Sequence, residues 1–234
     1  GGVPTIGDAC LALPVVLVLM IYVGGFASTK GMLAGLLATQ GIVAGVPVLM
    51  TLYTKKDWKR TFRIRLCRPG FFVGGIFLIL GAIALGVIVT SITSVLFPNS
   101  ADAMATSMDE IYRMGYGASI LIVALLPAVC EELLFRGFLY SSFEARMTQG
   151  KAIVLVAVIF GLYHMNIVQS TTTVVIGLAI CYLSAQSESL FPGILMHFLN
   201  NALAVTQTFY SDAVSKYLKG NSGTPGVVLE LIYI

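Results

Sequence analysis

A small set of polar residues in a long apolar sequence has the side-chain types that acid–base chemistry requires. The set is Glu131, Glu132, Arg136, His164, His197, Asn200 and Asn201, and it includes both histidines of the chain. A carboxylate and a neutral imidazole together can hold a water molecule and take its proton as it attacks a carbonyl. A second imidazole and an amide N–H can donate hydrogen bonds to the oxyanion that forms. The set therefore predicts hydrolysis of a peptide bond without a covalent intermediate.

Other routes to hydrolysis lack their sequence motifs. There is no GxSxG, and Cys130 has no necessary histidine partner. The metalloprotease motif HExxH is absent, and the four cysteines show no CxxC spacing, so we interpret them as packing residues. We expect no cofactor and no metal. One alternative gives the site a zinc ion, because Glu131, His164 and His197 would supply the three protein ligands of a catalytic zinc.

The composition indicates what kind of scaffold holds these residues. Charged residues make up 11% and hydrophobic residues 57% of the 234 residues, whereas a soluble domain has roughly 25% charged residues. This excludes a water-soluble globule, a disordered tail and a nucleic-acid-binding domain, so we expect membrane lipids and no nucleic acid among the partners. We predict an all-α, polytopic transmembrane helical bundle that forms a single integral membrane domain over residues 1–234.

The length of the apolar runs predicts about seven to eight spans, since a hydrocarbon core of about 30 Å requires about 20 residues of helix. The predicted spans are 9–28, 31–53, 71–97, 116–140, 152–168, 170–186 and 190–210. The apolar run 227–234 is interpreted as the start of a possible truncated last span. Gln40, a polar residue in the second span, is expected to hydrogen-bond to a neighbouring helix.

Basic residues predict the orientation. Seven of the 14 Lys and Arg residues lie between Lys55 and Arg68, and the positive-inside rule places this loop in the cytoplasm, near anionic lipid. The loop from Pro98 to Gly115 carries three acidic residues and suits the outside. We therefore expect a multi-pass protein of the cell membrane with a cytoplasmic N-terminus, and its short loops favour a prokaryotic plasma membrane.

Helix geometry separates the two adjacent glutamates. Neighbouring residues on an α-helix point about 100° apart, so Glu131 and Glu132 do not both face one small site. Glu132 and Arg136 have the i,i+4 spacing of a helical ion pair, which leaves Glu131 as the unpaired acid. Pro127, four residues before Glu131, is expected to bend the helix.

Depth in the membrane relates the remaining candidates. From the helical rise per residue, we expect Glu131, His164, His197 and Asn201 in one layer between the cytoplasmic face and the midplane. His197 and Asn201 have i,i+4 spacing and face one way together. Asn200, at i,i+3 from His197, is a rival for the same role. The four groups are expected to form one polar cavity.

Three short runs also resemble known motifs. Glu131-Glu132-x-x-x-Arg136, Phe160-x-x-x-His164 and His197-x-x-x-Asn201 are similar to the three motifs of the CAAX protease and bacteriocin-processing (CPBP, formerly abortive-infection) family. The resemblance covers about residues 116–210, and the first three spans contribute only hydropathy. That family includes the type II CAAX prenyl endopeptidase, an intramembrane glutamate protease.

The resemblance implies a role for each residue. Glu131 would be the general base, with His164 as its partner in activating water. His197 and Asn201 would form the oxyanion site, and the motif favours Asn201 over Asn200. The supporting residues would be Glu132, Arg136 and Phe160, the first two structural and the last packed near the site.

The expected function is an intramembrane endopeptidase that cuts near the cytoplasmic leaflet. Its substrate would be a peptide or lipidated protein, such as a prenylated CaaX terminus, a bacteriocin or signalling-peptide precursor, or a membrane-anchored regulator. The alternative is a proton-coupled transporter in which Glu131 and the histidines relay protons. Many transporters show a repeat between their two halves, and this sequence shows no convincing one.

Overall fold

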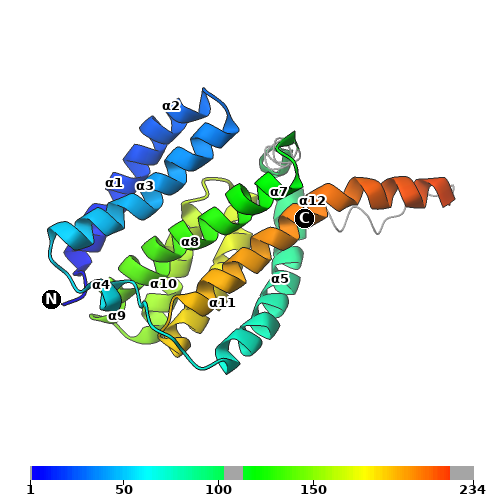
Figure 1. Cartoon of the computed structure of the whole chain (residues 1–234). Coiled ribbons are helices and arrows are strands. Elements are labelled where there is room, and N and C mark those ends of the chain that lie inside the picture. The colour runs from blue at the N-terminus through cyan, green and yellow to red at the C-terminus, as the bar shows by residue number, and fades with distance from the viewer. Residues whose placement is uncertain (1, 103–112, 222–234) are drawn as a thin grey trace.

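A computed structural model describes residues 2–102 and 113–221, and over these ranges the chain is all-helical, without strands (Figure 1). The first hairpin contains α1 (Ile6–Leu19), η1 (Met20–Gly24), α2 (Gly25–Ser28) and α3 (Met32–Tyr53). A capping box starts α1, because the Thr5 hydroxyl accepts from the Asp8 N–H and the Asp8 carboxylate accepts from the Thr5 N–H. Gly31 turns the chain into α3 at φ 126°, a backbone conformation that favours glycine.

The fourth predicted span is one long helical segment that contains two π-helical stretches. It consists of α7 (Tyr116–Ser119), η2 (Ile120–Leu125), α8 (Leu126–Glu132), η3 (Leu133–Leu139) and α9 (Tyr140–Glu144). The segments η2 and η3 are π-helical, a winding that is common at functional sites. Pro127 lies in the first turn of α8, directly after η2, where its missing N–H is best tolerated. The segment Tyr116–Glu144 therefore changes winding on both sides of the two glutamates.

The described residues form further helices. They are α4 (Trp58–Thr61), α5 (Gly70–Leu96), α10 (Gln149–Leu162), α11 (Ile167–Ser187) and α12 (Phe191–Asn221). α8 packs against α3 on one side and α12 on another, while α11 packs against α5, α10 and α12 (Figure 1). This arrangement gives α8 two neighbours that are distant from it in the sequence, α3 and α12.

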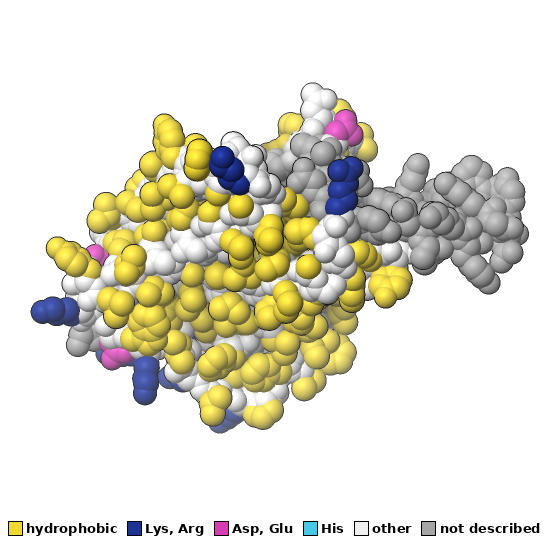
Figure 2. Space-filling view, turned by 45° about the horizontal axis from the view of Figure 1, so that its top comes forward, with side chains coloured by type: hydrophobic (Ala, Val, Ile, Leu, Met, Phe, Trp, Pro, Cys, Tyr) yellow, Lys and Arg dark blue, Asp and Glu magenta, His cyan; other side chains and the backbone are white. Residues whose placement is uncertain are grey.

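The helix lengths and the outer surface agree with a membrane protein. Five helical segments of the described residues are long and apolar enough to cross a membrane: Ile6–Ser28, Met32–Tyr53, Gly70–Leu96, Tyr116–Glu144 and Ile167–Ser187. Figure 2 shows hydrophobic side chains spread over a broad face, as expected for contact with lipid. The segment Tyr116–Glu144 has 44% of its most apolar window buried, against 22% for each of the first three segments. The helix with both glutamates is thus the most enclosed of the five.

Three predicted spans need comment. The prediction for 152–168 extends too far, because α10 has 14 residues and ends at Leu162, which puts His164 in the connection to α11. The predicted span 190–210 corresponds to the first part of α12, which begins at Phe191 and is not among the five segments above. The predicted segment 227–234 lies outside the described residues. The all-helical, polytopic fold class is confirmed.

The basic loop is part of the packed structure. Its residues Thr61, Phe62 and Arg63 are buried, and the Ser141 hydroxyl donates to the Thr61 carbonyl at 2.9 Å. Phe62 packs so closely on Gly137 of η3 that a Cβ atom there would lie 2.8 Å from the Phe62 ring. The loop therefore packs against η3 at Gly137, the residue that follows Arg136.

Candidate active site

A buried ion pair forms the base of the site. Glu132 and Arg136 are both 0% exposed, and Nη1 of Arg136 donates to Oε1 of Glu132 at 2.8 Å, as the i,i+4 spacing predicts. Nη2 of Arg136 donates to the carbonyl of Gly177 in α11 at 3.2 Å. The Arg136 guanidinium also lies 4.3 Å from the centroid of the Phe160 ring, a cation–π contact. Each charge therefore has a partner in a place where an unpaired charge would be very unfavourable.

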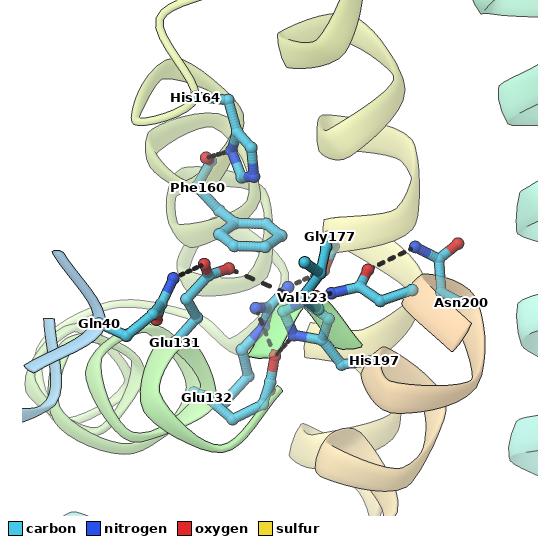
Figure 3. Close-up of polar contacts among 11 residues, drawn as sticks. Gln40, Val123, Glu131, Glu132, Phe160, His164, Gly177, His197 and Asn200 are labelled. Carbon is cyan, nitrogen blue, oxygen red and sulfur yellow. Dashed lines mark hydrogen bonds and ion pairs between the residues drawn. The ribbon is translucent and has the colours of Figure 1, made fainter. Parts of the chain in front are cut away.

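This ion pair also orients His197. Nδ1 of His197 lies 2.8 Å from Oε1 of Glu132, the same oxygen that binds Arg136 (Figure 3). A carboxylate paired with arginine only accepts hydrogen bonds, so the hydrogen of this bond belongs to Nδ1. Nε2 of His197 is left for the other side of the ring, where it lies 3.7 Å from Oε2 of Glu131.

Glu131 differs from Glu132 in both exposure and partners. Its side chain is 14% exposed, and its Oε1 accepts a hydrogen bond from Nε2 of Gln40 at 2.9 Å. Its Oε2 faces His197 across a gap that is too long for a direct hydrogen bond. Glu131 is outside the Glu132–Arg136 ion pair, as the helix geometry predicts, and it has in addition a hydrogen bond from α3 that geometry within one span does not predict.

Phe160 stands between the two imidazoles. Its ring, 2% exposed, makes edge-to-face contacts with His164 at 5.1 Å and with His197 at 5.7 Å between centroids. His164 is half-buried, and its Nδ1 lies 2.9 Å from the Phe160 carbonyl. A carbonyl only accepts, so Nδ1 donates and Nε2 is left unprotonated in the neutral ring. In Figure 3, His164 lies above the Phe160 ring and Glu131 lies below it.

The two asparagines on α12 have different positions. Nδ2 of Asn200 donates to Oδ1 of Asn201 at 3.1 Å, and Nδ2 of Asn201 donates to the carbonyl of Val123 in η2 at 3.4 Å. The second of these bonds is long and therefore weak. Asn201 is thus oriented by Asn200 and held loosely at η2, one helical turn from His197.

The structure brings four of the predicted site residues into direct contact, while His164 is joined to them through Phe160 and Asn201 bonds to Asn200 and Val123. Glu131, Glu132, Arg136 and His197 form one contact network, and Phe160 connects this network to His164. Within the described residues, no three His, Cys, Asp or Glu side chains lie close enough to hold a metal ion. Glu131, His164 and His197 are therefore not assembled as a ligand set.

Gln40 contacts the site, and sequence analysis assigned it no role there. It lies in α3, is 5% exposed, and contacts the candidate base directly. The available signal was a single carboxamide in an otherwise apolar span. That signal predicted an interhelical hydrogen bond, which is present, but it did not indicate which helix would accept it.

Comparison with known proteins gives one family. The profile described as "Type II CAAX prenyl endopeptidase Rce1-like" matches residues 114–203. The matched segment includes all the predicted site residues and does not include Gln40. No curated protein and no solved structure gave a significant match to the chain.

Proposed function

Residues 114–203 are similar to the type II CAAX prenyl endopeptidase family, and from this similarity we propose that the chain is a glutamate-dependent intramembrane endopeptidase. The observation that carries the proposal is the pairing of Glu131 with His197. A partly exposed carboxylate and a buried imidazole from different helices face each other at 3.7 Å, and each is oriented by a second partner. A water molecule hydrogen-bonded to both groups suits this separation.

The charges of the network support a defined proton position. Glu131 and Glu132 carry two negative charges and Arg136 one positive charge, which leaves one negative charge to be balanced inside the membrane. A proton on Nε2 of His197, next to Oε2 of Glu131, balances it. Glu131 is then ionised and suited to be a base, while His197 is suited to donate.

Hydrolysis follows from these positions. Glu131 takes a proton from the water as the water oxygen forms a bond to the carbonyl carbon of the substrate. Nε2 of His197 and Nδ2 of Asn201 donate hydrogen bonds to the resulting oxyanion. The carbon–nitrogen bond then breaks, and Glu131 transfers the proton to the departing amine.

His164 has an assisting role in this proposal. Because its Nδ1 donates to the Phe160 carbonyl, its Nε2 is an acceptor that suits the second proton of the attacking water. Glu132, Arg136 and Phe160 support the site through the contacts described above and do not contact the substrate.

We propose that the substrate is a peptide or a lipidated protein that reaches the site from the membrane. The reaction would take place near the cytoplasmic leaflet of a cell membrane, with the N-terminus of the chain in the cytoplasm. The basic loop between Lys55 and Arg68 supports this orientation. A prenyl group is one of several lipid anchors that fit a site enclosed by membrane helices.

A cleavage assay with Glu131→Gln tests the proposal. The protein, purified in detergent or liposomes, is incubated with a peptide library that includes farnesylated peptides, and products are identified by mass spectrometry. We expect the wild type to cleave some of them and Glu131→Gln to lose about 10²- to 10⁴-fold in rate with an unchanged melting temperature.

Glu144→Gln is the matched control. Glu144 ends the same helical segment and pairs with Arg63 away from the site, so this variant is expected to keep its activity. Full hydrolysis by Glu131→Gln would contradict the assignment of the base. Proton-linked solute flux without any peptide cleavage would favour the transporter.

A further inference from the structure

The two ends of the Gln40 side-chain amide lie in different situations. It is 95% buried in α3, which packs against α8 and η3, and its Nε2 donates to Oε1 of Glu131. Its own carbonyl oxygen is buried and has no hydrogen-bond partner in the described part of the chain. One end of the amide is thus bonded to the candidate base while the other end is unsatisfied.

The engaged end determines how the Glu131 carboxylate is turned. The terminal torsion of a glutamate is soft and has no sharp intrinsic preference, so its orientation follows its donors. The bond from Gln40 fixes Oε1 toward α3, which turns Oε2 toward His197 on α12. Without this bond, the carboxylate would rotate between positions that face the water site and positions that do not.

The unsatisfied end makes a purely structural role unfavourable. A buried acceptor without a partner costs about 1–3 kcal/mol of stability, and an apolar side chain of similar length would avoid this cost. The other buried residues of α3 are Gly35, Val43 and Pro47, which have no polar side-chain atoms, and Thr51, whose hydroxyl donates within α3. A residue that weakens the packing and contacts the candidate base is typical of a functional site.

We propose that Gln40 is a positioning residue of the active site and that it holds Glu131 in the orientation that activates water. The inference rests on the proposed function. The catalytic site is thus completed by the first hairpin, outside the segment that matches the family profile.

The experiment compares Gln40→Met with a matched control on the same helix. Methionine keeps the length of the side chain and removes the donor. We expect kcat to fall about 10- to 100-fold, as for a misplaced reacting group, with KM nearly unchanged. The melting temperature should stay equal or rise, because the unsatisfied carbonyl is removed as well. Thr51→Val, which removes a buried hydroxyl that bonds only to Pro47 within α3, should leave kcat unchanged.

A second measurement follows chemical modification of the Glu131 carboxyl group and does not depend on hydrolysis. A hydrophobic carbodiimide modifies protonated carboxyl groups in apolar surroundings, and mass spectrometry locates the product. Without the donor from Gln40 the Glu131 carboxyl is no longer held against α3 and is more open to the reagent, so Gln40→Met should be labelled there several-fold faster than the wild type. Thr51→Val should be labelled at the wild-type rate.

The outcomes separate the two proposals. Wild-type protein that cleaves no peptide would contradict the proposed function, and the labelling rates would still decide whether Gln40 holds Glu131. Unchanged kcat together with unchanged labelling in Gln40→Met would overturn the role of Gln40. A fall in kcat accompanied by an equal loss of folded protein would also overturn it, because it would show a structural role.

Discussion

Glu131 and Glu132 are adjacent on α8 and yet lie on two faces of the helix with opposite character. The Glu132 face is closed, with the side chain 0% exposed and its Oε1 shared by Arg136 and His197. The Glu131 face is partly open, with the side chain 14% exposed and a neutral amide as its hydrogen-bond donor. The same residue type is thus a fixed counter-ion on one face and, in the proposed mechanism, the base on the other.

The closed face orients His197, the residue that faces Glu131 on the open face. The Glu132–Arg136 pair fixes Nδ1 of His197, and this in turn presents Nε2 to Glu131. A buried ion pair does little for stability compared with apolar packing. Its value here is the orientation of the imidazole, so the two faces are expected to respond to substitution in different measurements.

Glu132→Ala should have the largest effect on stability. It leaves the Arg136 guanidinium buried without its counter-ion, which destabilises a protein by about 3–5 kcal/mol. The measurement is denaturant or thermal unfolding in detergent, compared with Glu131→Gln, for which we expect wild-type stability. Glu132→Gln, which removes the charge and keeps the shape, should fall between them. Equal stability of Glu132→Ala and wild type would show that the two faces do not differ as described.

Asn201→Ala should have the next largest effect, on the rate. Removal of one oxyanion donor lowers kcat by about 10²- to 10³-fold, and the fold should be little affected because the bond to Val123 is weak. Asn200→Ala is the control, since Asn200 acts only by orienting Asn201 and its loss should lower kcat far less. The reverse order of the two effects would give the oxyanion role to Asn200.

The sequence predicted the parts of the site that depend on local spacing. Glu132 and Arg136 form their i,i+4 pair because residues four apart lie on one side of a helix, and the π-helical winding that begins at Leu133 keeps them in contact. The same spacing places His197 and Asn201 one turn apart on α12. The bond between Gln40 and Glu131 joins residues 91 positions apart, and only the packing of α3 on α8 determines it.

The position of His164 was mispredicted for a different reason. Hydropathy continues through residues 152–168, but α10 ends at Leu162, Met165 has a positive φ of 53°, and the Asn166 side chain caps α11. Asn166 is a typical N-cap residue, so the boundary had a local signal that an apolar run conceals. His164 therefore reaches the site from a loop, over the Phe160 ring.

Phe160→Leu should have a moderate effect on both stability and rate. The ring contacts Arg136 on the closed face and both imidazoles, and these contacts are worth about 1–3 kcal/mol in total. We expect a matching loss of stability and a lower kcat. Phe143→Leu is the control, because Phe143 is buried in the same core away from the imidazoles. Its variant should lose stability without a specific fall in kcat.

Removal of metal should have the smallest effect. The proposed mechanism balances its charges with its own residues, since Arg136 and the proton on His197 offset the two glutamates. Gln40 and Glu132 already direct Glu131 and His197 by hydrogen bonds, and His164 is bound to the Phe160 carbonyl. Activity should therefore be the same before and after treatment with a zinc chelator such as dipicolinate. Stoichiometric zinc in active protein, lost together with activity, would instead mean that Glu131, His164 and His197 rearrange around a metal, and the distinction between the two faces would then depend on that ion.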